Sequence, residues 1–206
     1  MLKYAKYIVP AAILLLVLSY FYVDIPLTIW VTEQPSYVLR SGKILSWLIS
    51  PHVYVLVLPL IFYFYTFGLR KSTYRKELLF LVLAIPIVIL SVDILKVIFG
   101  KARPALWIHQ QIYGFYFFGS SSKYHSFPSG HGCTIGALMG ALSCFRPSLT
   151  WVYLAIALLL SLLRVFSLNH YLSEAWGGVL IAFYIVYLLY LPYQKVLKRN
   201  WLWRII

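Results

Sequence analysis

The chain has 206 residues, of which 62% are hydrophobic and only 11% are charged. Soluble domains carry about 25% charged residues, so this composition excludes an ordinary soluble protein and indicates an integral membrane protein of one domain. The net charge of +13 would suit a nucleic-acid-binding protein, but the basic residues flank apolar runs, where they would hold the chain at a negatively charged membrane face.

Six apolar segments are long enough, or nearly so, to cross a hydrocarbon core about 30 Å thick. The first follows Lys3 and Lys6 as a signal peptide would, but no small-residue cleavage site comes after it, so we expect a retained helix. Only three residues separate the fourth and fifth segments, which predicts a tight antiparallel hairpin. The six segments cover residues 8–23, 44–67, 78–99, 131–145, 149–167 and 173–193. We therefore expect an all-α membrane protein with six transmembrane helices in a bundle, forming a single domain over residues 1–206.

Basic residues beside the short connections predict the orientation of this bundle. Positive charge near short loops marks the cytoplasmic face, and both termini are therefore predicted to be cytoplasmic. The long polar segment 100–130 would then lie on the opposite, extracytoplasmic face, together with the three clusters described next. The basic residues that define the cytoplasmic side are Lys3, Lys6, Arg70, Lys71, Arg75, Lys76, Arg146, Lys195, Lys198, Arg199 and Arg204.

The first cluster closes the third apolar segment and contains Lys96 and Arg103. Lysine supplies a point charge and arginine a planar fork that can hold two phosphate oxygens. An equally simple interpretation is that both are interfacial residues whose side chains extend to the membrane surface. Asp93 precedes Lys96 by three residues, and we expect it to neutralise the lysine as a helical ion pair.

The second cluster, Pro128-Ser129-Gly130-His131, stands directly before the fourth apolar segment. Ser129 is a good helix N-cap and Gly130 allows close backbone approach, so the free N–H groups of the first turn could bind an anion. A plain helix cap would explain Ser129 and Gly130 equally well. It would not explain the titratable His131, which could protonate a leaving-group oxygen.

The third cluster is Arg164, His170 and Glu174, between and within the last two apolar segments. Residues 170 and 174 would share a helix face, so the carboxylate could fix the tautomer of the imidazole and leave its other nitrogen free to attack phosphorus. A satisfied interfacial His–Glu pair is the simpler alternative. A zinc site made of His131, His170 and Glu174 is a second one, but the nearby arginines and lysine would repel a cation.

Taken in order, the three clusters resemble the signature of the type 2 phosphatidic acid phosphatase family of membrane lipid phosphatases. The resemblance covers about residues 75–193. It has two departures, because Leu163 replaces a serine and Glu174 replaces an aspartate of the family pattern. The matching residues are Lys96, six residues, Arg103-Pro104; then Pro128-Ser129-Gly130-His131; then Arg164, five residues, His170, three residues and Glu174.

This resemblance implies a bacterial inner-membrane enzyme whose site faces the periplasm and needs neither a metal nor another cofactor. It implies that His170 is the nucleophile and forms a phosphohistidine, that Glu174 orients it, and that His131 is the proton donor and later the base. The phosphoryl oxygens would be held by Lys96, Arg103, Ser129, Gly130 and Arg164.

The implied reaction is removal of phosphate from a membrane lipid. Lipid A, an isoprenyl diphosphate, phosphatidylglycerol phosphate and phosphatidic acid are the candidate substrates, and the resemblance favours lipid A or a related envelope lipid. Two other functions fit the same residues. A phosphohistidine could pass its phosphoryl group to a second lipid, which would make the protein a phosphotransferase. The departures in the third motif could instead mark a non-catalytic lipid-binding protein with a degenerate site. The expected partners are the lipid substrate and the bilayer, with no nucleic acid and no indicated oligomeric state.

Overall fold

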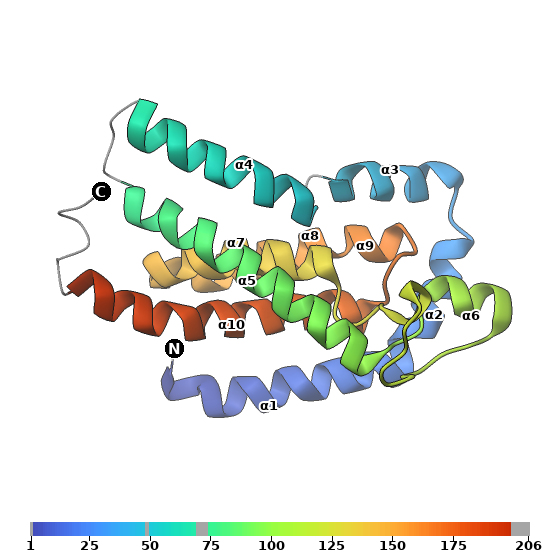
Figure 1. Cartoon of the computed structure of the whole chain (residues 1–206). Coiled ribbons are helices and arrows are strands. Elements are labelled where there is room, and N and C mark those ends of the chain that lie inside the picture. Colours follow the sequence, from blue (N-terminus) through green and yellow to red (C-terminus); the bar gives the residue numbers. More distant parts are fainter. Residues whose placement is uncertain (1, 48–49, 69–73, 199–206) are drawn as a thin grey trace.

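The computed structural model of the chain describes residues 2–47, 50–68 and 74–198 (Figure 1). Within these ranges every element is helical, apart from one isolated antiparallel bridge between Lys101 and Phe115. The long helices run alongside one another in a bundle (Figure 1). The all-α fold predicted from the apolar runs is therefore confirmed.

The elements are α-helices of 4 to 27 residues and short turns of 3-10 or π-helix. In chain order they are α1 (Leu2–Leu18), η1 (Ser19–Val23), α2 (Asp24–Thr32), α3 (Ser36–Ser46), α4 (Pro51–Tyr63), η3 (Phe64–Gly68), α5 (Arg75–Phe99), α6 (Pro104–Gln110), η4 (Ser122–Tyr124), α7 (Gly130–Phe145), η5 (Pro147–Leu149), α8 (Thr150–Ser161), α9 (Leu163–Phe166) and α10 (Leu172–Lys198). Prolines begin α4 and α6, where the missing N–H costs nothing because the first turn has no acceptor for it.

Five helical stretches of the described residues are long and apolar enough to cross a membrane. They overlap with five of the six expected spans. The expected fourth span, residues 131–145, forms α7, whose 16 residues rise only about 24 Å. The six-span count and the side of the membrane on which the termini lie stay predictions. The five stretches are Pro10–Thr32, Ser36–Phe67 (across residues 48–49, which lie outside the described ranges), Arg75–Phe99, Pro147–Phe166 and Leu172–Leu197.

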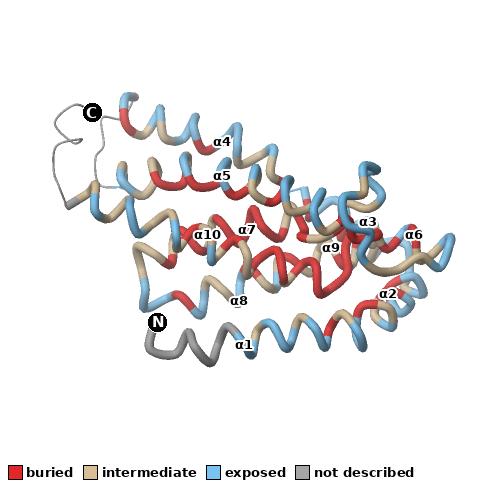
Figure 2. The backbone as a smooth tube through the Cα atoms, turned by 60° about the horizontal axis from the view of Figure 1, so that its bottom comes forward, coloured by how far each residue is buried: buried red, intermediate tan, exposed pale blue. Residues whose placement is uncertain are grey.

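Helix α7 is the centre of the bundle. It packs against α5, α8 and α10, and Figure 2 shows buried residues concentrated where these helices meet. A Cβ atom on Gly132 would lie 2.6 Å from the carbonyl oxygen of Ala175, and one on Gly136 would lie 2.8 Å from that of Val179. Small residues let membrane helices approach closely, so these glycines bring α7 into contact with α10.

The outer helices present large apolar side chains to the surroundings. Phe21, Leu56, Leu90 and Leu159 are each more than 60% exposed, and much of the outer surface of α1 and α4 is exposed in Figure 2. An exposed apolar surface of this extent is not found on soluble monomers and marks a contact surface for lipid. The exposed apolar side chains and the hydrophobic composition therefore both indicate an integral membrane protein.

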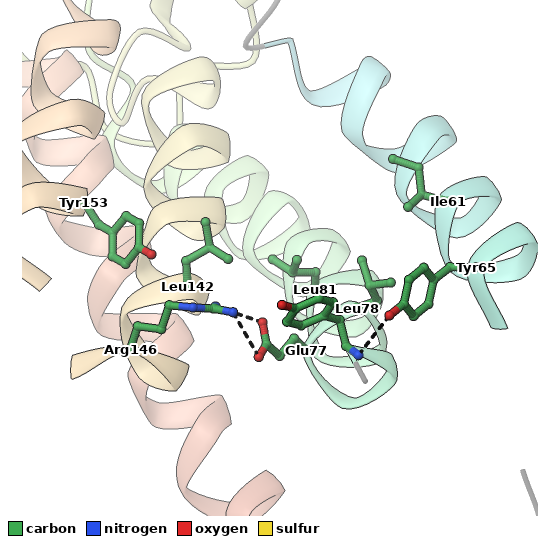
Figure 3. A pocket seen from close by; sticks show the side chains of 9 residues that line it. Ile61, Tyr65, Glu77, Leu78, Leu81, Leu142, Arg146 and Tyr153 are labelled. Atoms are coloured by element: carbon green, nitrogen blue, oxygen red, sulfur yellow. Dashed lines mark hydrogen bonds and ion pairs between the residues drawn. The ribbon is translucent and has the colours of Figure 1, made fainter. Parts of the chain in front are cut away.

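The two ends of the bundle differ in chemistry. At one end, Arg146 donates to both carboxylate oxygens of Glu77 at 2.9 and 3.3 Å, beside an open cavity of about 480 Å³ that contacts α4, α5, α7 and α8 (Figure 3). Arg75 and Lys195 belong to the same end, whereas Arg70, Lys71, Arg199 and Arg204 of the predicted cytoplasmic set lie outside the described residues. At the other end α5 stops and α7 and α10 begin, and this end carries the three sequence clusters.

Candidate active site

The first cluster is divided by the end of α5. Gly100 caps this helix in the left-handed conformation, with φ 56°, and a Cβ atom on it would lie 2.0 Å from the carbonyl oxygen of Tyr116. Only glycine fits this turn. Lys96 is therefore on the last turn of α5, whereas Arg103 lies beyond it as the residue preceding α6, and the two side chains do not share a helix face.

Lys96 links the first cluster to the second. Its Nζ atom lies 2.7 Å from Oδ1 of Asp93, which confirms the expected i,i+3 ion pair. The same Nζ atom would lie 3.3 Å from a Cβ atom on Gly130. The ammonium group therefore stands directly beside the first turn of α7, and glycine at position 130 leaves room for it.

The start of α7 is capped by Ser129. Its Oγ atom accepts a 3.3 Å hydrogen bond from the N–H of Gly132, and its side chain is fully buried. The capping role expected for this serine is confirmed. The N–H groups of Gly130 and His131 belong to the first turn, where a helix offers no carbonyl acceptor. These two donors and the positive end of the helix dipole lie in the turn that Lys96 approaches.

His170 and Glu174 form a buried polar pair at the centre of the third cluster. Nδ1 of His170 lies 3.1 Å from Oε2 of Glu174, and both side chains are buried. The same oxygen accepts hydrogen bonds from the backbone N–H of Tyr171, at 3.1 Å, and from the hydroxyl of Ser126. An ionised carboxylate can only accept hydrogen bonds. Nδ1 of His170 therefore carries the proton, and Nε2 keeps its lone pair.

The prediction that His170 and Glu174 share a helix face is wrong. Helix α10 begins at Leu172, so His170 lies before the helix and Glu174 is its third residue. Glu174 bonds back to the N–H of Tyr171, which is the reciprocal contact of a capping box. The carboxylate thus meets the imidazole because it caps the start of α10. The four-residue spacing between His170 and Glu174 spans the turn before the helix and its first three residues.

Burial sets the protonation of His170. Loss of water contact lowers the pKa of this imidazole to about 4, and the positive charges of Arg103 and Arg164 act in the same direction. The hydrogen bond and charge of Glu174 oppose this shift. The ring is consequently neutral at physiological pH, which is the state in which its Nε2 can act as a nucleophile.

Arg103 is held by three backbone carbonyl groups. Its Nε donates to Ser122 at 3.1 Å, Nη2 to His125 at 3.2 Å and Nη1 to Asn169 at 3.4 Å. Burial lowers the pKa of this guanidinium, and the charge of Glu174 opposes that effect. Arginine keeps its charge at any physiological pH. A fixed cation is thus placed beside the residue that precedes His170.

Arg164 approaches from α9. Its backbone carbonyl accepts the N–H groups of Asn169 and His170 at 3.1 and 3.2 Å, which shapes the turn that presents His170. Its Nη1 donates to the hydroxyl of Ser46 in α3 at 3.1 Å. Its buried Nε–H has no hydrogen-bond partner among the described residues. An unpaired buried donor costs about 1–3 kcal/mol, so this arginine is well suited to an anionic ligand.

His131 lies within the same group of charges. Arg164, His170, Lys96 and His52 all act electrostatically on its ring. The structure therefore brings all eight predicted residues to one end of the bundle. Within the described ranges, no three His, Cys, Asp or Glu side chains are grouped closely enough to hold a metal ion. The alternative zinc site needs His131, His170 and Glu174 together and has no such ligand set here.

Two charged residues of this region were missed by the sequence analysis. Lys101 lies inside the six-residue spacing of the first motif, and its Nζ is 3.3 Å from Oε1 of Glu174 and 3.1 Å from Oδ2 of Asp24. In the structure Asp24 lies inside the apolar helical stretch Pro10–Thr32, whereas the sequence analysis ended the first apolar segment at residue 23. A charge in such a place is costly and marks a functional or structural partner, and this signal was present in the sequence.

Comparison with known proteins agrees with the geometry. The family model described as the PAP2 superfamily matches residues 77–198. The chain is 33% identical over 90 residues to a lipid A 1-phosphatase of Rhizobium johnstonii and 32% identical over 90 residues to a lipid A 1-phosphatase of Rhizobium etli. Each alignment covers 44% of this chain and 37% or 39% of the relative, so the match spans about two fifths of these proteins. No solved structure matches the chain significantly.

Proposed function

The chain belongs to the PAP2 superfamily, and on this premise we propose that it is a membrane lipid phosphatase that works through a phosphohistidine on His170, without a metal or another cofactor. One observation carries the proposal: Oε2 of Glu174 lies 3.1 Å from Nδ1 of His170 and also accepts from Ser126 and Tyr171. This arrangement fixes the imidazole with Nε2 unprotonated, as a nucleophile requires.

In the first step the lone pair on Nε2 of His170 forms a bond to phosphorus as the bond from phosphorus to the lipid oxygen breaks. His131 gives a proton to that departing oxygen. Lys96 and Arg164 place positive charge around His131, and the negative charge of a phosphate bound between them would offset it. Glu174 stabilises the positive charge that develops on the His170 ring.

In the second step water attacks phosphorus and the phosphorus–nitrogen bond breaks. His131, neutral after the first step, takes the proton from this water. Inorganic phosphate leaves and His170 recovers its lone pair. Both histidines then return to their starting protonation states, so the cycle balances without an external acid or base.

Cations and N–H donors hold the transferred phosphoryl group. Lys96 and Arg103 approach from the first motif, Arg164 offers its unpaired Nε–H, and Gly130 contributes a backbone N–H at the start of α7. Ser129 acts mainly by capping that helix. Fixed donors of this kind stabilise the charge on the equatorial oxygens, because they need no reorganisation during the reaction.

We propose the 1-phosphate of lipid A, or a closely related glycolipid phosphate, as the substrate. The names of the two rhizobial relatives support this choice. The exposed apolar surface of the outer helices supports a substrate that stays in the bilayer. The proposed location is a bacterial inner membrane, with the site toward the periplasm. The basic residues Arg75, Arg146 and Lys195 at the opposite end of the bundle support this orientation.

The test is phosphate release by purified protein in detergent, with chelator present, from a panel of lipid A, phosphatidic acid, phosphatidylglycerol phosphate and isoprenyl diphosphate. We expect release from lipid A and none from the His170→Asn variant. Trapping of labelled phosphate on the protein, lost in the same variant, would support the covalent intermediate. Full activity of His170→Asn would overturn the mechanism. A labelled lipid product in place of free phosphate would identify a phosphotransferase instead.

A further inference from the structure

Three buried charges form a continuous chain behind His170. Nζ of Lys101 lies 3.1 Å from Oδ2 of Asp24 and 3.3 Å from Oε1 of Glu174, and all three side chains are completely buried. Oε1 of Glu174 has no aligned hydrogen bond in the described structure, so its compensation comes from the charge of Lys101. Ser173 extends the chain, because its hydroxyl donates to Asp24 and accepts from Lys101.

The ammonium group of Lys101 lies in an aromatic enclosure. Ring centroids of Tyr20 and Tyr171 are each 4.7 Å from Nζ, that of Tyr113 is 5.2 Å away and that of Phe115 is 5.8 Å away. The faces of aromatic rings attract cations. Burial, and after it the charge of Asp24, raises the pKa of the Tyr113 phenol, which keeps its hydroxyl protonated 3.0 Å from Oδ2 of Asp24. The enclosure therefore holds a charged lysine away from lipid and water.

From this geometry we propose that Lys101 is a positioning residue, which keeps Glu174 ionised and thereby holds His170 as the Nδ1–H tautomer, and that Asp24 is the counter-ion that holds the Lys101 ammonium group in place. The inference rests on the proposed phosphatase function and assigns a role to two residues that the family motifs do not specify. Neither residue touches the site of phosphate transfer. They act through Glu174, since one buried carboxylate beside an ammonium group stays charged, whereas two buried carboxylates without a cation share a proton.

The tautomer depends on this charge state. If Glu174 is a carboxylate, it accepts from Nδ1–H and leaves Nε2 free to attack phosphorus. If Glu174 carries a proton, it can donate to Nδ1 and the imidazole proton moves to Nε2, where it blocks attack. Lys101 favours the first state and Asp24 opposes it. The two residues should therefore have opposite effects on the tautomer, although they belong to one network.

Several charged and titratable groups surround Glu174. Lys101, Tyr171 and His170 face it directly, and Asp24 faces it across Lys101. Arg103 also acts on it from the loop before α6. The remaining groups, Tyr20 and Tyr113, surround Lys101, and Arg164 and His131 lie on the far side of His170. Removal of Lys101 deletes the cation nearest to Glu174 and leaves two carboxylates in the same enclosure.

The direct readout is the ¹⁵N NMR spectrum of histidine-labelled protein in detergent, with the His170 signals assigned by their loss in His170→Asn. Wild-type protein and Asp24→Asn should both show the Nδ1–H tautomer near neutral pH. Lys101→Met should show the Nε2–H tautomer and return to Nδ1–H only at higher pH. The Nδ1–H tautomer in folded Lys101→Met across this range would overturn the proposal.

Lys101→Met leaves two buried carboxylates without a cation and could fail to fold. The double variant Asp24→Asn/Lys101→Met removes one negative and one positive charge together, which buried pairs tolerate better than loss of a single partner. It still deprives Glu174 of its cation, so it should also show the Nε2–H tautomer. An Nδ1–H signal in the folded double variant would overturn the proposal in the same way.

Kinetics give a second readout. Loss of the correct tautomer should lower kcat by about 10²–10⁴-fold in Lys101→Met, with KM nearly unchanged and the acidic limb of the pH–rate profile moved to higher pH. Asp24→Asn should leave that limb in place or move it to lower pH. Equal loss in both variants without movement of the limb would indicate a merely structural network. The NMR result needs no substrate, so failure to find a lipid substrate would count against the proposed function and not against this inference.

Discussion

The backbone N–H of Ser129 donates a 3.2 Å hydrogen bond to the backbone carbonyl of Glu174. This bond joins the first turn of α7, which offers N–H groups to an anion, to the first turn of α10, whose carboxylate orients His170. The two motifs are therefore parts of one rigid unit. A shift of either helix would move the anion site relative to the imidazole.

The contact between these helices should be sensitive to one methyl group. A Cβ atom on Gly178 would lie 2.8 Å from the carbonyl oxygen of Ser129, whereas one on Gly140 would lie 3.3 Å from Cα of Phe183. We expect Gly178→Ala to destabilise the fold by about 1–3 kcal/mol and to lower activity, and Gly140→Ala to do less of both. Thermal unfolding and phosphate release in detergent would check this order, and the reverse order would contradict it.

Glu174 should tolerate neither neutralisation nor shortening. Glu174→Gln keeps the shape but lets an amide N–H face Nδ1, so kcat should fall about 10²–10⁴-fold. Glu174→Asp restores the residue usual in the family, yet a side chain one methylene shorter cannot keep its contacts with both His170 and Lys101. We expect a loss of about tenfold, in line with small misplacements at active sites. An aspartate variant as active as the wild type would show that the glutamate has no special fit here.

Arg164 and Arg103 should act on binding of the phosphate group. Arg164→Lys removes the planar fork and its unpaired Nε–H, so vanadate or phosphate inhibition should weaken by about 10–100-fold, which corresponds to about 1.5–3 kcal/mol for hydrogen bonds to charged groups. Lys123→Gln is a suitable control, because this exposed residue lies in the same loop as two of the three carbonyl partners of Arg103. Equal inhibition constants in Arg164→Lys and the wild type would exclude the predicted contact.

His170 should make the fold sensitive to acid. Its pKa is about 4 in the folded protein and about 6.5 in the unfolded chain, so the unfolded state binds a proton first. The free energy of unfolding is therefore unaffected by this titration above about pH 6.5. It falls by at most about 3 kcal/mol as the pH drops toward about 4. On acidification across this interval, the Tm of the wild type should fall more than the Tm of His170→Asn. A constant difference would contradict the buried neutral ring.

Much of this site followed from the sequence because its residues are polar groups at the ends of apolar runs. Asp93 and Lys96 had helical spacing and formed the expected pair, and Ser129 formed the expected cap. The geometry of His170 and Glu174 was misjudged, because the start of α10 depends on a capping contact that periodicity does not reveal. Lys101 and Asp24 were missed since their partnership joins segments 77 residues apart, and only tertiary packing brings these segments together.

The match to the family model begins at residue 77, and Asp24 lies outside it. A fragment trimmed to that match would retain every signature residue and yet leave Lys101 without Asp24, its buried counter-ion. The buried charge network of this site therefore extends beyond the region that identifies the family, and exchange of helix α2 between relatives would change the surroundings of Lys101.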